Sequence, residues 1–129
     1  MERLILDSGV LIAAERGRVR VPDDDVAIAS ITASELLVGV ARADDHHREL
    51  RSRSVEEVLR TFEVLPFDIG AARQHALLMA WTQASGSPRG AHDLIIAATA
   101  SATGRTVLTT DQRGFGDLPG VTVRVLTSN

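Results

Sequence analysis

Residues 4–14 read LILDSGVLIAA, and this stretch decides the fold class. The apolar residues 4–6 predict a short buried strand, residues 7–9 predict a turn, and residues 10–14 predict a short helix that stops near Gly17. A buried strand that leads directly into a helix is the beginning of a strand–helix unit. If such units repeat along the chain, the fold is α/β with a parallel sheet.

The pattern does repeat, with apolar runs and helical segments in alternation. Thr32 and Glu35 have the spacing of a capping box at a helix start, and Pro66 places its strand at a sheet edge. Strands are predicted at residues 26–31, 64–67, 106–110 and 121–126, and helices at residues 36–41, at 46–60, from the cap Asp68 to Trp81, and from Asp93 to Ala100 with its end at Gly104. The sequence therefore predicts an open parallel sheet with helices on both faces.

Composition limits the function classes. The chain has 129 residues, which predicts a single domain (1–129), and its hydrophobic fraction of 44% is that of an ordinary globular protein. It has no cysteine, which excludes disulfides, thiolate metal sites and cysteine nucleophiles. All 14 basic residues are arginine, so a P-loop lysine, a Schiff base and a lysine general base are excluded. Without a membrane-length apolar run or a signal-peptide pattern, we expect a cytoplasmic protein without membrane contact.

Four acidic residues occupy similar places in the predicted fold: Asp7, Glu35, Asp93 and Asp111. Asp7 and Asp111 follow predicted strands, and the other two begin predicted helices. Taken singly, each has a structural explanation as a helix cap, a first-turn residue or a turn residue. Together they converge on the carboxyl edge of a parallel sheet, where ligands bind. Their repulsion there would be relieved by a divalent cation, and an oxygen-only ligand set favours Mg²⁺ or Mn²⁺ over zinc.

The sequence lacks the residues that several other α/β protein classes require. A receiver domain fits the length and the alternation, but it needs a lysine near its last strand. The chain also lacks the Gly-x-Ser-x-Gly elbow of a serine hydrolase. His92 precedes Asp93, but neighbouring helical residues point about 100° apart, which disfavours a catalytic role for this histidine. The arginines between residues 42 and 60 alternate with as many acidic residues, which favours a solvated helix face over an RNA-binding track.

Four motifs in order carry a family resemblance. They are LDSGVLI at residues 6–12, TASELLVG at 32–39, GAHDLIIAA at 90–98, and LTTD at 108–111 followed by Phe115. With these motifs the sequence resembles PIN-domain proteins, and specifically the VapC toxins of type II toxin–antitoxin systems, from residue 1 to about residue 126. The resemblance implies a three-layer α/β/α sandwich with a mostly parallel sheet. It also implies a metal-dependent endoribonuclease, a VapB-type antitoxin partner and a homodimer.

The resemblance suggests a role for each acid. Asp7 and Asp93 would hold the principal Mg²⁺, with Glu35 and Asp111 completing the site. Many relatives have an acid before the phenylalanine of the last motif, where this chain has Gly114, so the fourth role rests on Asp111, with Asp117 as the alternative. An aromatic content of 3% leaves few platforms for stacking unpaired bases, which favours structured RNA as the substrate. The alternative reading is a PIN-like module that binds RNA or protein without cleaving it.

Overall fold

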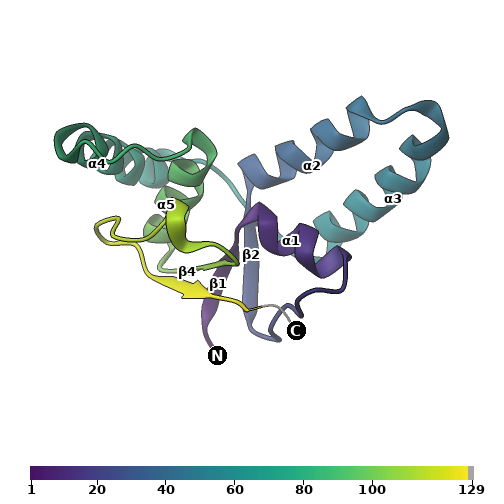
Figure 1. Ribbon diagram of the computed structural model, residues 1–129, viewed down its shortest axis with the longest axis horizontal. Coiled ribbons are helices and arrows are strands. Elements are labelled where there is room, and N and C mark those ends of the chain that lie inside the picture. Colours follow the sequence, from purple (N-terminus) through teal and green to yellow (C-terminus); the bar gives the residue numbers. More distant parts are fainter. Residues whose placement is uncertain (128–129) are drawn as a thin grey trace.

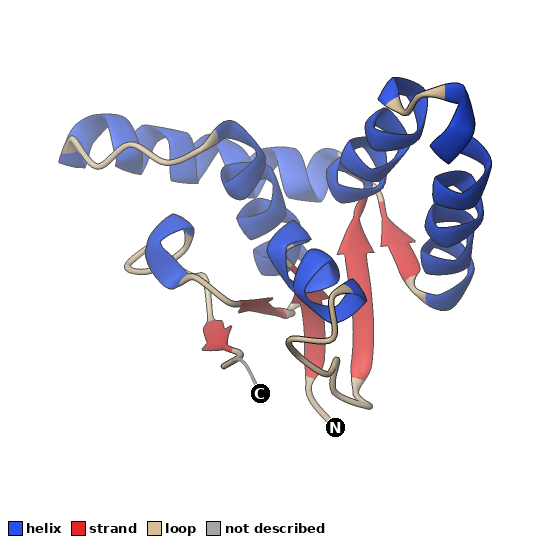
Figure 2. Cartoon of the chain, turned by 45° about the vertical axis from the view of Figure 1, so that its right-hand side comes forward, coloured by secondary structure: helices blue, strands red, loops and turns tan. Residues whose placement is uncertain are grey.

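The computed structural model describes residues 1–127, and its helices lie on both sides of a central sheet (Figures 1 and 2). The apolar runs predicted from the sequence produce this arrangement, because the three central strands are buried between the helices. In chain order the elements are β1 (Arg3–Leu6), α1 (Ser8–Glu15), β2 (Asp25–Ala29), α2 (Ser30–Arg42), α3 (Asp45–Thr61), β3 (Glu63–Leu65), α4 (Ile69–Ser85), α5 (Ala91–Thr103), β4 (Thr106–Thr109), the 3₁₀ helix η1 (Gln112–Gly114) and β5 (Val123–Val125).

The sheet is parallel throughout, in the order β3-β2-β1-β4-β5. At its centre, Ile5 of β1 pairs with Ala27 of β2 on one side and with Val107 of β4 on the other. The chain builds outward from β1 to β3 and then returns to the other side of β1 to place β4 and β5. This reversal lies between β1 and β4, and in open α/β sheets the crevice at such a point, beside the carboxyl ends of the strands, is where ligands bind.

Each face of the sheet has its own apolar core, as expected of a three-layer sandwich. Leu4 and Leu6 of β1 point to one face, where they pack with residues of α1, α2 and α3. Ile5 points to the other face, which is covered by α4 and α5. The alternation within three successive residues therefore divides the helices into two layers. The predicted α/β/α sandwich with a parallel sheet is confirmed.

The predicted boundary between β2 and α2 is wrong. The sequence places a strand at residues 26–31 and a capping box at Thr32 and Glu35, but β2 ends at Ala29 and α2 begins at Ser30 with no side-chain cap. The apolar run that includes Ile31 fits a buried strand and a buried helix equally well, so periodicity alone could not locate the change. Glu35 therefore lies in the second turn of α2, free of any capping role.

Other elements follow the sequence closely. Helix α3 covers the predicted residues 46–60, and the Asp68 carboxylate caps α4 by accepting a 3.0 Å hydrogen bond from the amide of Ala71. Helix α5 ends at Gly104, which is in the left-handed conformation at φ 65°. Within residues 1–127 no helix has the length and the apolar character needed to cross a membrane.

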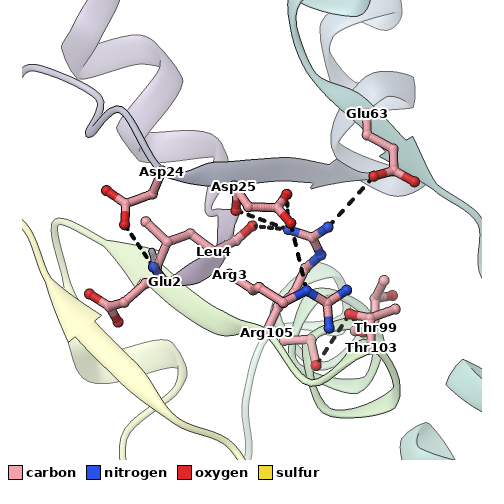
Figure 3. Close-up of polar contacts among 10 residues, drawn as sticks. Glu2, Arg3, Leu4, Asp24, Asp25, Glu63, Thr99, Thr103 and Arg105 are labelled. Atoms are coloured by element: carbon pink, nitrogen blue, oxygen red, sulfur yellow. Dashed lines mark hydrogen bonds and ion pairs between the residues drawn. The ribbon is translucent and has the colours of Figure 1, made fainter.

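A buried arginine ties the amino ends of the strands together (Figure 3). The Arg105 side chain is 3% exposed, and its Nη1 donates 3.0 Å hydrogen bonds to the carbonyl oxygens of Leu4 and Asp25. It also pairs with the carboxylates of Asp25, at 3.1 Å, and Glu63, at 3.6 Å. One side chain at the start of β4 thus reaches β1, β2 and β3, at the end of the sheet away from the predicted site. The sequence analysis made no prediction for it.

Candidate active site

Asp7 follows β1 at the carboxyl edge of the sheet. It stands in the N-cap position of α1, but its side chain does not cap the helix. Its Oδ2 accepts a 2.9 Å hydrogen bond from the hydroxyl of Thr109 at the end of the neighbouring strand β4. Burial raises the pKa of this carboxyl, the hydrogen bonds from Thr109 and the Ser8 amide oppose the rise, and the charges of Glu35 and Asp111 add to it. The capping explanation for Asp7 therefore fails.

Glu35 reaches the same place from α2. Its Oε1 accepts a 3.0 Å hydrogen bond from the hydroxyl of Ser8, the residue that follows Asp7. The same oxygen lies 3.5 Å from Nδ1 of His92. The Ser8 hydroxyl thus orients Glu35, as the Thr109 hydroxyl orients Asp7. His92, in the first turn of α5 beside Asp93, thus contacts Glu35.

Asp93 lies in the first turn of α5, against two glycines. A Cβ atom added to Gly90 would stand 3.2 Å from Oδ2 of Asp93, and one added to Gly114 would stand only 2.5 Å from it. The carboxylate thus fills the space that a side chain at position 114 would need. Burial raises the pKa of Asp93, and the charges of Asp7 and then Glu35 raise it further, whereas His92 lowers it.

Asp111 differs from these three acids. It is exposed, and its carboxylate caps η1 by accepting a 3.1 Å hydrogen bond from the amide of Arg113. The Arg113 guanidinium also forms an ion pair with the carboxylate, and its Nη2 donates a 2.5 Å hydrogen bond to Oδ2. These contacts lower the pKa of Asp111 to about 2. Asp117 is exposed and stands in a turn at φ 67°, the conformation of a turn residue.

The structure therefore brings Asp7, Glu35 and Asp93 together and leaves Asp111 at the rim, near enough for its charge to affect Asp7 and Asp93. The donor chemistry fits a hard divalent cation, because every acidic ligand offers oxygen. Burial and charge repulsion also disfavour the ionised forms of two of the carboxyls, and a cation would relieve this. Over residues 1–127 no three His, Cys, Asp or Glu side chains are arranged so that they could hold a metal ion together. A cation would require the carboxylates to move closer than they lie here.

Arg89 supports the site, and sequence analysis missed it. Its Nε donates a 3.2 Å hydrogen bond to the carbonyl of Arg113 and its Nη2 a 2.6 Å bond to that of Gly116, so it holds the segment on both sides of Gly114. Its Nη1 holds Ser87 in the preceding loop, and its guanidinium lies 5.7 Å from the centre of the Trp81 ring. Gly114 is pressed against Asp93 through this arrangement. An arginine in a loop gives no signal of such a role without the fold.

An apolar groove adjoins the site. It has a volume of about 290 Å³ and lies between α1, α2 and α3, where Ser8 and Glu35 form its polar end. Its other lining residues are Leu11, Ile12, Glu15, Leu36, Gly39, Arg51, Ser54, Val55 and Val58. Ile12 is 47% exposed there. We name this surface the apolar groove. In this groove apolar side chains of α1 and α2 remain partly uncovered within residues 1–127.

Comparison with known proteins shows which family has this architecture. The family described as "PIN domain" matches residues 4–121. The chain is 31% identical to Ribonuclease VapC1 of Rickettsia felis over 97% of both chains, and 32% identical to the tRNA(fMet)-specific endonuclease VapC of Salmonella typhimurium over 84% of this chain and 80% of that protein. A solved member of the VapBC family of toxin–antitoxin systems, VapBC-5 from Mycobacterium tuberculosis, superposes with a TM-score of 0.77 at 34% identity, over 98% of this chain and 99% of that one. With its fold, its three gathered acids and these relatives, the chain belongs to the VapC toxin family of PIN-domain ribonucleases.

Proposed function

We propose that this ribonuclease toxin is a Mg²⁺-dependent endonuclease that cleaves structured RNA of the tRNA or rRNA class and so arrests translation and growth. Residues 1–129 would act as one PIN domain. The observation that carries the proposal is the grouping of Asp7, Glu35 and Asp93. Three carboxylates from separate segments stand at one edge of the sheet, and the pKa values of Asp7 and Asp93 are raised. Such an arrangement lowers stability unless a cation binds there.

The residues divide the work as follows. Asp7 and Asp93 would hold the cation, with Mn²⁺ as a substitute for Mg²⁺, and Asp111 would contribute from the rim. Glu35 would orient the attacking water and accept its proton. Thr109 and Ser8 fix the orientation of two of these carboxylates through the hydrogen bonds described above. When bound, the metal lowers the pKa of a water molecule and offsets negative charge that develops on the phosphate.

The proposed substrate class rests on chemistry and on one relative. The chain has an aromatic content of 3%, so base stacking contributes little and recognition depends on backbone and shape. The relative from Salmonella typhimurium is named for cleavage of tRNA(fMet). A tRNA pool is therefore the first substrate to test.

We propose that the apolar groove receives a VapB-type antitoxin as an amphipathic segment, and that two copies of the chain form a homodimer. Five aliphatic side chains of the three helices line the open groove, with polar residues among them, which suits an amphipathic helix. Glu35 at its polar end belongs to the proposed catalytic site. A segment seated in the groove would thus stand beside the catalytic carboxylates and block them, which explains how one partner can both bind and inhibit.

The experiment is cleavage of total RNA and of a tRNA pool by the purified protein, with Mg²⁺ and with a chelator. We expect discrete fragments only with Mg²⁺ and none from Asp93→Asn. Asp23→Asn, a change at an exposed acid far from the site in the sequence, is the matched control and should cleave like the parent. Fragments that Asp93→Asn still produces would contradict the assignment.

A second candidate is a PIN-like module that binds without cleaving. The observation that favours it is the fourth acidic position, where Gly114 has no carboxylate and Arg113 holds that of Asp111. RNA left intact by the parent under every condition, together with growth arrest that persists in Asp93→Asn, would support this candidate over the nuclease.

A further inference from the structure

Helix α1 borders another hollow, on the face next to the apolar groove, and Ile12 lines both. The hollow has a volume of about 210 Å³ and is lined by Gly9, Ile12, Ala13, Arg16, Arg18 and Thr110. We name it the basic track. Its four residues from α1 and the end of that helix are spaced i, i+3, i+4 and i+7, which places them on one face. At 1.5 Å per residue the track extends about 10 Å along the helix.

One end of the basic track lies at the catalytic acids. A Cβ atom added to Gly9 would stand 3.5 Å from Oγ1 of Thr110 and 3.8 Å from Oδ2 of Asp7. Thr110 lies between Thr109, which holds Asp7, and Asp111 at the rim. A molecule that leaves the acidic site along this face of α1 therefore enters the track directly.

The other end carries two positive charges on a well-defined turn. Gly17 adopts the left-handed conformation at φ 71°, and the amide of Arg18 bonds to the carbonyl of Ala13 at 2.8 Å. This turn brings Arg16 and Arg18, on either side of the glycine, to the same hollow. Both side chains are exposed, and within residues 1–127 neither takes part in an ion pair or a side-chain hydrogen bond.

Three of the four arginines of α3 are paired with acidic residues. Arg48 pairs with Asp45, Arg53 with Glu49 and Arg60 with Glu57, all on the helix surface. Their charges are thus partly neutralised, in agreement with the solvated helix face expected from the sequence. Arg51, the fourth arginine of α3, lies in the apolar groove proposed for the antitoxin. On the side of Asp7 that faces Thr110, the positive charge comes from the end of α1.

We propose that Arg16 and Arg18 bind backbone phosphates of the RNA strand on one side of the scissile bond; this inference rests on the proposed nuclease function. Three acidic residues at the site repel a polyanion, so binding requires cations placed along the strand's path. Guanidinium groups suit this task because they donate several hydrogen bonds to phosphate oxygens. A purely structural explanation accounts for Arg16, because a positive charge at the end of α1 interacts favourably with the helix dipole. It does not account for Arg18 across the turn. A protein partner fits the apolar groove better, because five aliphatic side chains line that groove and only Ile12 and Ala13 line this hollow.

The test measures RNA affinity and cleavage separately. Arg16→Gln with Arg18→Gln is compared with Arg42→Gln with Arg73→Gln, which removes the same charge from exposed arginines on α2 and α4 that form no ion pair within residues 1–127. Binding of a labelled tRNA pool is followed by fluorescence anisotropy in an Asp93→Asn background over a range of salt concentrations. The electrostatic part of binding is independent of sequence, so this probe serves whichever RNA is cleaved.

We expect the Arg16/Arg18 variant to bind about tenfold more weakly, with the slope of log Kd against log salt reduced by about 1 for each lost contact. In cleavage, KM should rise while kcat stays near the parent value, because neither arginine touches the reacting atoms. Equal affinity and slope in the two double variants would overturn this inference and leave the nuclease proposal standing. If instead the salt effect appears but the parent cleaves no RNA, the nuclease proposal fails while phosphate binding by the track is supported. If the Arg16/Arg18 variant binds RNA as tightly as the control variant but binds the antitoxin more weakly, the track belongs to the protein partner and the inference is overturned.

Discussion

Asp93 is expected to lower the stability of the metal-free protein. Its pKa is raised by burial and by the charges of Asp7 and Glu35, so the folded state disfavours its ionised form. We therefore expect Asp93→Asn to melt at a higher temperature than the parent in chelator at neutral pH. The carboxyl is partly open to solvent, and screening limits the gain to about 1–3 °C. Added Mg²⁺ should then raise the melting temperature of the parent and leave that of the variant unchanged, as measured by calorimetry.

The pH dependence supplies the control. A carboxyl whose folded pKa lies above its unfolded value of 3.8 destabilises the fold when ionised, and protonation removes that penalty as the pH falls through the folded pKa. The advantage of Asp93→Asn should therefore shrink from neutral pH towards pH 4, whereas Asp23→Asn should show no such trend. A variant that melts lower than the parent would mean that the first-turn carboxylate gains more from the α5 amides than it loses by repulsion.

The sequence identified the acids but not their neighbours. Asp7, Glu35 and Asp93 could be found because their motifs end strands or begin helices in a regular alternation. The lack of an acid at position 114 was also visible. That the Asp93 carboxylate lies where a side chain at position 114 would stand depends on how the turn after β4 packs against α5, and no local pattern encodes that contact. The contact between His92 and Glu35 escaped for the same reason, because it joins two helices.

At the scale of elements, Arg89 connects the loop before α5 to η1. We expect Arg89→Ala to release the segment around Gly114 from Asp93 and to raise the Mg²⁺ concentration needed for half-maximal cleavage by about tenfold. Arg89→Lys should not rescue it, because three different nitrogens of the planar guanidinium make these bonds and the single nitrogen of a lysine cannot stand in all three places. Titration of cleavage with Mg²⁺ measures the effect. Arg73→Ala, on the neighbouring helix α4, is the control, and an Arg89→Ala curve that matches it would exclude the positioning role.

The boundary between β2 and α2 shows why element limits were harder to predict than element types. Residues 26–31 are uniformly apolar or small, and a parallel strand and a buried helix use the same residues. The chain becomes helical at Ser30, where the carboxyl edge of the sheet is reached. The helix then brings Glu35 to the hydroxyl of Ser8. Thr32, predicted as half of a capping box, is instead completely buried inside α2.

At the scale of the whole molecule, the topology explains how distant motifs meet. Segments near residues 7, 35, 93 and 111 reach one edge because every strand is parallel and the sheet reverses its order beside β1. The alternation of strands and helices was enough to predict that edge. The position of α1 between the apolar groove and the basic track was not predictable, since it depends on which residues of a nearly uniform apolar helix remain uncovered.

Arg105 is the counterpart of the site at the opposite end of the sheet, and it should affect stability without affecting chemistry. Its guanidinium satisfies the carbonyls of Leu4 and Asp25 and faces Glu63, so one side chain links β4 to β1, β2 and β3. We expect Arg105→Met to lower the free energy of unfolding by about 2–4 kcal/mol, because buried carbonyls lose their donor and the acids lose their counter-charge. Below its melting temperature the variant should retain the parent's kcat and Mg²⁺ requirement.

Urea unfolding followed by circular dichroism measures the change, with Arg124→Met as the control. Arg124 pairs with Glu2 at 2.6 Å, but both side chains are well exposed, at 40% and 49%. Exposed ion pairs contribute about 0–1 kcal/mol, so this control should lose little stability although it removes the same charge from the same sheet. Replacement of buried ion pairs by apolar residues can also be neutral or stabilising. An Arg105→Met protein as stable as the Arg124→Met protein would therefore show that packing of the methionine compensates for the lost hydrogen bonds, and that the two apolar cores hold the sheet together without this arginine.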